Sequence, residues 1–273
     1  MNARRWTSPC VLGVAVAVVA AACGSRGAEA APAAVAPSAD APAGPHTVVV
    51  FATASLGPAF QALARRYEAD HPGGRVELVV AGGARLLARM NAGERADVVA
   101  IGDSSLMSRF AASALLAAHS PTELARSRIA IAVRAGDAKG IRSLRDLARP
   151  DVRVALGARS SSIGRHGRWV LSRQQLEVTP AAEGDSAAAV LARLVAGEAD
   201  AAIVYTTTCR GVDGVVTVTV PEAENTPVLY SISETREAKE PRGAAAFRAL
   251  ALGADGQAIL KEHGLLPIGA KGP

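Results

Sequence analysis

Hydrophobic and polar residues follow one another in a repeating pattern of strand, small loop and helix from residue 46 onward. The first unit begins with the apolar run 48–52, which predicts a buried strand. After the small residues Ala54 and Ser55, apolar positions recur at helical spacing through Phe60, Leu63 and Tyr67. The same pattern predicts further strands at 75–80, 97–101, 129–133, 152–156, 201–205, 215–220 and 228–232. Helical patterns follow around residues 86–90, 106–110, 144–147, 169–176, 187–195, 244–252 and 257–263.

Consecutive strand–loop–helix units imply parallel sheets with helices on their faces. The strands at 129–133 and 228–232 stand where the chain could pass between two such sheets. We therefore predict an α/β protein of two lobes, each a mainly parallel sheet flanked by helices, with a ligand cleft between the lobes. The boundaries we expect are 46–127 plus 230–273 for lobe 1 and 128–229 for lobe 2. Ligands of such sheets bind beyond the carboxyl ends of the strands.

The loop around Ser55 is the first candidate site, because it joins a buried strand to a helix start. Unpaired N–H groups and the positive end of the helix dipole favour an anion there. Ser55 adds a hydroxyl donor, although a serine at this place is also a common N-cap of a helix. Pro58 suits the first turn, where its missing N–H is no loss.

The N-terminal segment predicts export and anchoring. Arg4 and Arg5 precede an apolar run, 11–22, that is too short for a permanent membrane-spanning helix. Small residues directly before Cys23 resemble the bacterial lipobox, which makes residues 1–22 a lipoprotein signal peptide and Cys23 the lipidated residue. An ordinary signal peptide, with Cys23 uninvolved, is the alternative. Residues 23–45, rich in Ala and Pro, predict a flexible linker that holds the protein at the outer face of the cell membrane or in the periplasm.

The amino-acid composition and the charge limit the classes of function that the protein can have. Hydrophobic residues make up 49% of the 273 residues but aromatic ones only 3%, so the core must consist of small aliphatic side chains. Loss of residues 1–22 would leave 28 basic and 25 acidic residues, which is too balanced to favour nucleic acid as a partner. The scattered histidines and the lone Cys209 of the folded part predict no metal site, no disulfide and no cofactor.

Five segments in order along the chain resemble the periplasmic molybdate-binding proteins of ABC importers, within the type II periplasmic binding superfamily. They are FATASL at 51–56, AGERADV at 92–98, GIRSL at 140–144, VRVALG at 152–157 and GEADAAIVY at 197–205. The resemblance implies the two-lobed fold predicted above and a tetrahedral oxyanion held by hydroxyl and backbone N–H groups.

The resemblance also assigns ligand-binding positions. Ser55 and Tyr205 match hydroxyl donors of the family, and Ile163 and Ala187 match positions that donate backbone N–H groups at helix starts. Gly83 stands where the family usually has a serine, so one hydroxyl is missing. We expect one serine of 160–162, with Ser162 as our choice, to replace it from across the cleft. The pairing of these serines with nearby arginines also differs from the family, which leaves the choice of anion open.

The function we predict is capture of molybdate or tungstate, by a monomeric lipoprotein, for the permease of an ABC transporter. Another oxyanion, such as sulfate, phosphate or a phosphonate, is the first alternative. An enzyme on the same scaffold is a second, although the chain shows no nucleophile elbow, metal cluster or closely spaced pair of acids. A sensor domain of a transcription regulator is a third, against which the export signal argues.

Overall fold

Strands and helices follow one another in the predicted order in the computed structural model, which describes residues 44–118 and 121–268. The strands are β1 (His46–Thr53), β2 (Gly74–Ala81), β3 (Val98–Ile101), β4 (Thr122–Arg134), β5 (Val154–Gly157), β6 (Ala182–Gly184), β7 (Ala201–Tyr205), β8 (Val215–Thr219) and β9 (Pro227–Glu234). The α-helices are α1 (Gly57–Asp70), α2 (Gly83–Asn91), α3 (Ser104–Ala112), α4 (Ser162–Arg173), α5 (Ala187–Val195), α6 (Pro241–Leu252) and α7 (Ala254–Glu262). Three 3₁₀ helices complete the set: η1 (Ala54–Leu56), η2 (Arg145–Ala148) and η3 (Thr206–Thr208). Only β6, η1 and η3 were not predicted, and each is too short to show a hydrophobic period.

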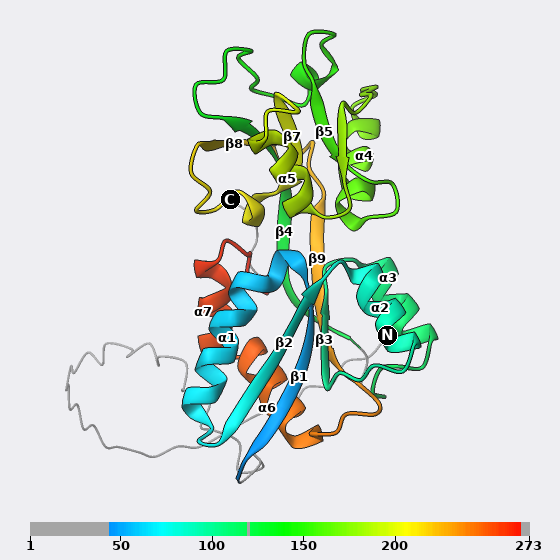
Figure 1. Ribbon diagram of the computed structural model, residues 1–273, viewed down its shortest axis with the longest axis vertical. Coiled ribbons are helices and arrows are strands. Elements are labelled where there is room, and N and C mark those ends of the chain that lie inside the picture. Colours follow the sequence, from blue (N-terminus) through cyan, green and yellow to red (C-terminus); the bar gives the residue numbers. More distant parts are fainter. Residues whose placement is uncertain (1–43, 119–120, 269–273) are drawn as a thin grey trace, which may run out of the picture. The chain divides into compact units, whose positions relative to one another are not determined.

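The strands pair in the order β2-β1-β3-β9-β4-β7-β5-β6, with β8 added beside β4. In one lobe β1 is parallel to β2 and β3, and in the other β5 is parallel to β6 and β7. The antiparallel pairs all involve β4 or β9, the strands that link the two parallel groups (Figure 1). The two-lobed α/β fold is confirmed, with each parallel group completed by antiparallel strands.

Strand β4 runs through both lobes. Its first half, as far as Arg128, pairs with β9, and from Ile129 onward it pairs with β7 and then also with β8. The hydrophobic pattern showed only the second half, because the first half carries charged residues on its partly exposed face. The residue at which β4 changes its pairing from β9 to β7 lies beside the lobe boundary at 127/128 that the sequence predicted. The lobe boundaries themselves stay a prediction.

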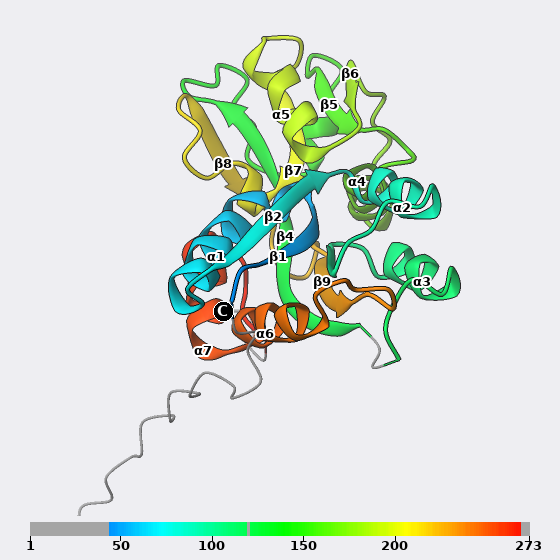
Figure 2. The ribbon, with the colours of Figure 1, turned by 60° about the horizontal axis from the view of Figure 1, so that its bottom comes forward.

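The first lobe is built in layers around a sheet whose two faces are both covered. Along β1, Val48 and Val50 pack into the cluster beneath α1, α6 and α7, whereas Phe51 packs into the cluster beneath α2 and α3. The helices accordingly lie on opposite faces of β1 and β3 (Figure 1, Figure 2). This alternation is the two-residue period of a strand buried on both sides.

The predicted signal segment 1–22, the lipidation site Cys23 and the linker as far as residue 43 lie outside the described residues. Within 44–118 and 121–268, none of the helices combines the length and apolar character needed to cross a bilayer. Cys209 is buried, and burial raises the pKa of its thiol.

Candidate functional site

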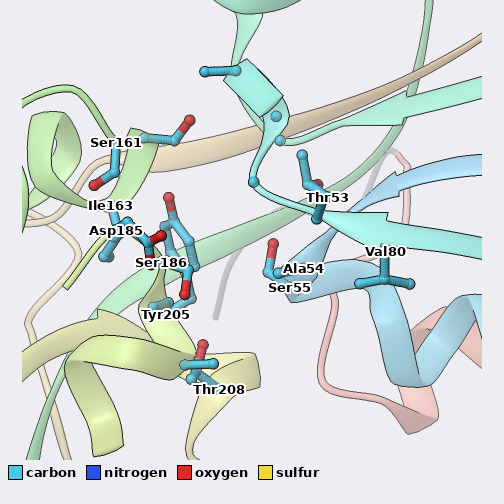
Figure 3. Close-up of a pocket in the computed structure, with 18 of the residues that line it drawn as sticks. Thr53, Ala54, Ser55, Val80, Ser161, Ile163, Asp185, Ser186, Tyr205 and Thr208 are labelled. Carbon is cyan, nitrogen blue, oxygen red and sulfur yellow. The ribbon is translucent and has the colours of Figure 1, made fainter. Parts of the chain in front are cut away.

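A cavity of about 820 Å³ lies where loops from both lobes face one another. Its walls come from the segments that follow β1, β2, β3, β5, β6 and β7, that is, from the carboxyl ends of the parallel strands. All six ligand-binding positions predicted from the sequence line it: Ser55, Gly83, Ser162, Ile163, Ala187 and Tyr205. Figure 3 shows Ser55 on one side and Ser161, Ser186 and Tyr205 on the other. The fold therefore brings together residues that are up to 150 positions apart in the chain.

Ser55 lies in η1, directly after β1, and its side chain caps neither η1 nor α1. The alternative interpretation, that Ser55 is the N-cap of a helix, is therefore wrong. Its Oγ instead accepts a hydrogen bond of 2.9 Å from the hydroxyl of Tyr230, a fully buried residue of β9. Burial raises the pKa of Tyr230 to about 12, so this hydroxyl keeps its proton and donates it. Ser55 consequently has its own proton free for a ligand.

Three helices begin at the cavity: α2 at Gly83, α4 at Ser162 and α5 at Ala187. The first N–H groups of a helix have no partner within it and carry its positive dipole end. In α4, Ser161 accepts from the N–H of Gly164, and in α5 Ser186 accepts from that of Ala189. These caps use only the third N–H of each helix. The N–H groups of Ile163 and Ala187 therefore remain without an intrahelical acceptor.

Position 83 has no room for a side chain larger than that of glycine. A β-carbon built on it would overlap Cδ2 of Leu106 and lie 3.2 Å from Cγ2 of Thr53. Its backbone is helical and does not have a positive φ. The space that a serine side chain would need at position 83, where the family usually has one, is therefore filled by neighbouring side chains.

Tyr205 ends β7 and is 5% exposed. Its hydroxyl lies 3.2 Å from Nδ1 of His166, a residue of α4. Burial raises the pKa of Tyr205 well above 10 and lowers that of His166 below its usual value, so both side chains are neutral at physiological pH. When Nδ1 of His166 carries the imidazole proton and donates to Tyr205, the phenol proton is available to a ligand.

Ser162 is engaged elsewhere. Its hydroxyl donates to Oδ2 of Asp103 at 2.9 Å, and the guanidinium of Arg165 pairs with the same oxygen. Asp103 comes from the first lobe, where it caps α3 by accepting from the N–H of Leu106. Burial acts to raise its pKa, but hydrogen bonds from Ser105, Leu106, Arg165 and Ser162 outweigh this and hold the pKa at about 2. A permanent carboxylate thus joins the lobes beside the cavity, with its charge neutralised by Arg165.

The rim of the cavity is positively charged. Four arginines line it, Arg85, Arg109, Arg165 and Arg210, and only Arg165 of these is paired with Asp103. Asp185 is the acidic residue of the lining, and its side chain is exposed to solvent. Such a rim attracts anions and raises their rate of arrival.

Sequence reasoning missed Tyr230, His166 and Asp103, which orient the predicted residues without lying in their motifs. Tyr230 is separated from Ser55 by 175 positions, so no local pattern could have linked them. Thr53 was also passed over, although its position at the end of β1, two residues before Ser55, was a usable signal.

Comparison with known proteins confirms the resemblance. Residues 48–266 match the family model described as "Bacterial extracellular solute-binding protein". The chain is 34% identical over 244 residues to the molybdate-binding protein ModA of Mycobacterium bovis, a match that covers 89% of this chain and 91% of that protein. The ModA of Mycobacterium tuberculosis matches equally well.

Solved structures share the fold at low identity. The periplasmic molybdate-binding protein of Azotobacter vinelandii superposes with a TM-score of 0.69 at 16% identity, over 80% of this chain and 98% of that one. The sulfate-binding protein SubI of Mycobacterium tuberculosis gives a TM-score of 0.71 at 18% identity, over 82% and 87%. Matches at this identity establish the fold and leave the ligand open.

Proposed function

This chain belongs to the family of bacterial extracellular solute-binding proteins, and we propose that it captures a tetrahedral oxyanion, molybdate or tungstate, for an ABC importer. The observation that carries the proposal is the convergence of neutral donors on one cavity. Ser55 approaches from the first lobe, Tyr205 and the N–H groups of Ile163 and Ala187 from the second, and the start of α2 at Gly83 closes the first-lobe side.

The chemistry suits a divalent anion. Each donor carries a partial charge, and the starts of three helices add their dipoles, so the charge of the ligand is shared among several groups. Ser55 and Tyr205 are held by Tyr230 and His166, so their hydroxyls do not need to be reoriented when the ligand arrives. The carboxylate of Asp103 is bound to Arg165 and Ser162 and is thereby kept from repelling the anion.

The choice of molybdate or tungstate over sulfate is supported by the relatives. The relative named for molybdate is 34% identical over nearly the whole chain, whereas the solved protein named for sulfate is 18% identical and shares the fold only. Sulfate, phosphate and phosphonate are the rival ligands. Capture and release require no covalent bond to be made or broken, and we propose that the cleft binds its ligand without catalysis. A monomer that delivers the anion to a membrane permease fits this role.

A titration of the purified protein tests the ligand. Molybdate, tungstate, sulfate, phosphate and thiosulfate would each be added in a thermal unfolding series, followed by calorimetry of those that stabilise. A ligand at a hundredfold excess over its dissociation constant should stabilise the fold by about 2.7 kcal/mol. Preference for sulfate or phosphate would replace molybdate as the ligand, and stabilisation by none of the five would contradict oxyanion capture.

Anchoring by lipid at Cys23 is part of the proposal. The family places the protein outside the cytoplasm, and the small residues before Cys23 support lipidation there. Cys23→Ser should release the protein from the membrane fraction or leave the precursor uncleaved. Fractionation and the mass of the mature chain measure both, and unchanged processing with unchanged membrane partition would contradict the anchor.

A further inference from the structure

Three threonine hydroxyls at the cavity have no hydrogen-bond partner among the described residues. They are Oγ1 of Thr53, Thr207 and Thr208, each buried and each belonging to a residue that lines the cavity. Buried polar groups are nearly always paired, because an unpaired one bears the cost of losing its water. Unpaired hydroxyls gathered at one cavity therefore indicate that a bound ligand is their hydrogen-bond partner.

Two of the three come from opposite lobes. Thr53 ends β1, two positions before Ser55, and is 8% exposed. Thr208 ends η3, which follows Tyr205, so it approaches from the opposite lobe, and its hydroxyl points into the space between the walls (Figure 3). Thr207 differs, because its hydroxyl lies close enough to that of Tyr230 to lower the pKa of the phenol, although it makes no hydrogen bond of normal geometry.

Thr53 also touches the place where a serine is missing. Its Cγ2 lies 3.2 Å from the β-carbon that a side chain at position 83 would have. A hydroxyl cannot come from Gly83, since Leu106 and Thr53 fill the space that it would need. Thr53 thus places its methyl group at this corner of the cavity from the neighbouring strand β1, and its hydroxyl is the other branch on the same β-carbon.

Two of the three serines expected to compensate for Gly83, Ser161 and Ser162, have their protons engaged. Ser161 donates to the carbonyl of Ala158 at 2.8 Å and accepts from the N–H of Gly164. Ser162 donates to Asp103. Ser160 is exposed to solvent. The threonines are therefore better placed than the serines to complete the donor set.

We propose that the hydroxyls of Thr53 and Thr208 donate hydrogen bonds to the bound oxyanion, one from each lobe, in place of the serine absent at position 83. The inference rests on the proposed function, because it names further residues of the same binding site. Both groups are neutral, so they add donors without adding charge.

Valine substitutions test the proposal, since valine keeps the branched shape of threonine and removes only the hydroxyl. Thr53→Val and Thr208→Val should each weaken molybdate binding about tenfold or more in titration calorimetry. Their melting temperatures without ligand should stay equal or rise, because an unpaired buried hydroxyl is being removed. A purely structural role would give the opposite result, a lower melting temperature with unchanged affinity.

Thr206→Val is the matched control from the same short helix. Thr206 shares a hydrogen bond of 3.2 Å with Ser127 and does not line the cavity. This variant should lose thermal stability and bind molybdate with nearly wild-type affinity. Thr53→Ser and Thr208→Ser, which keep the hydroxyl, should also keep most of the affinity.

Wild-type affinity in Thr53→Val or Thr208→Val would overturn the assignment of that residue. Equal losses in the serine and valine variants would overturn it as well, by assigning the effect to packing. These outcomes leave oxyanion capture itself intact. Absence of binding to the wild-type protein, with molybdate, tungstate, sulfate, phosphate and thiosulfate all tried, would instead overturn the proposed function together with this inference.

Discussion

The two walls of the cavity hold their donors in different ways. On the first-lobe wall, α1 and α2 begin without any side-chain cap, and Ser55 is oriented by a distant residue, Tyr230. On the second-lobe wall, α4 and α5 begin with serine caps that bond within their own first turn. One wall thus leaves its loop hydroxyls free for a ligand, and the other uses its loop serines to build helix ends.

The difference shows that the number of hydroxyl groups in a loop does not equal the number of donors available to a ligand. Ser161 and Ser162 have hydroxyl groups like that of Ser55, but their protons go to Ala158 and Asp103. A hydroxyl has one proton to donate, so the acceptor it already has decides its role. The second-lobe wall therefore offers backbone N–H groups, Tyr205 and, as we propose, Thr208, but not its capping serines.

Ser55→Ala should weaken binding of the anion more than the other variants below, and it tests whether the first-lobe wall offers a free hydroxyl. Loss of one hydrogen bond to a charged ligand should weaken binding about ten- to a hundredfold. The unfolding free energy without ligand should also fall, by about 1–3 kcal/mol, because the buried hydroxyl of Tyr230 loses its acceptor. Calorimetry and denaturant unfolding measure the two effects separately.

Tyr230→Phe is the control for this variant. It removes the buried donor and keeps the hydroxyl of Ser55, so its loss of affinity should be smaller than that of Ser55→Ala. Adding Ser55→Ala to Tyr230→Phe should then lower affinity with little further loss of stability. Intact affinity in Ser55→Ala would show that Ser55 serves only to pair with Tyr230.

Gly83→Ala and Gly83→Ser, compared as a pair, come next. Both place a β-carbon against Leu106, and overpacking of this kind costs about 1–3 kcal/mol of unfolding free energy. The two variants should bind molybdate alike, since the added hydroxyl meets an anion that already has its donors. Markedly tighter binding by Gly83→Ser than by Gly83→Ala would mean that the natural site lacks a donor.

Ser161→Ala should have the smallest effect on binding. The variant loses the N-cap of α4, which costs about 1 kcal/mol of stability. Its affinity for molybdate should change by no more than a few fold, because the N–H of Ile163 remains in place. A tenfold loss of affinity with normal stability would make Ser161 a ligand donor and remove the contrast between the walls.

The pattern of hydrophobic and polar residues along the chain determined most of the fold. The two-residue and helical periods predicted every strand except β6 and every α-helix. All of these elements except β2 and β8 bury apolar side chains that the sequence displays, and the apolar side chains of β2 and β8 are half-buried or exposed. The family resemblance then assigned Ser55, Gly83, Ile163, Ala187 and Tyr205, which lie just after strands, at a strand end or at helix starts, and all of them line the cavity. Parallel strands end at one edge of a sheet, so this convergence follows from the order of the elements.

Only the tertiary structure decided which polar groups are free to bind. Whether Ser55 caps a helix or keeps its proton depends on Tyr230, and whether Ser162 can donate depends on Asp103 of the other lobe. Gly83 lacks a side chain because Leu106 and Thr53 fill its space. A hydrogen-bonding role is set by the nearest acceptor and donor in space, and these partners come from segments that fold together without sharing any local pattern in the sequence.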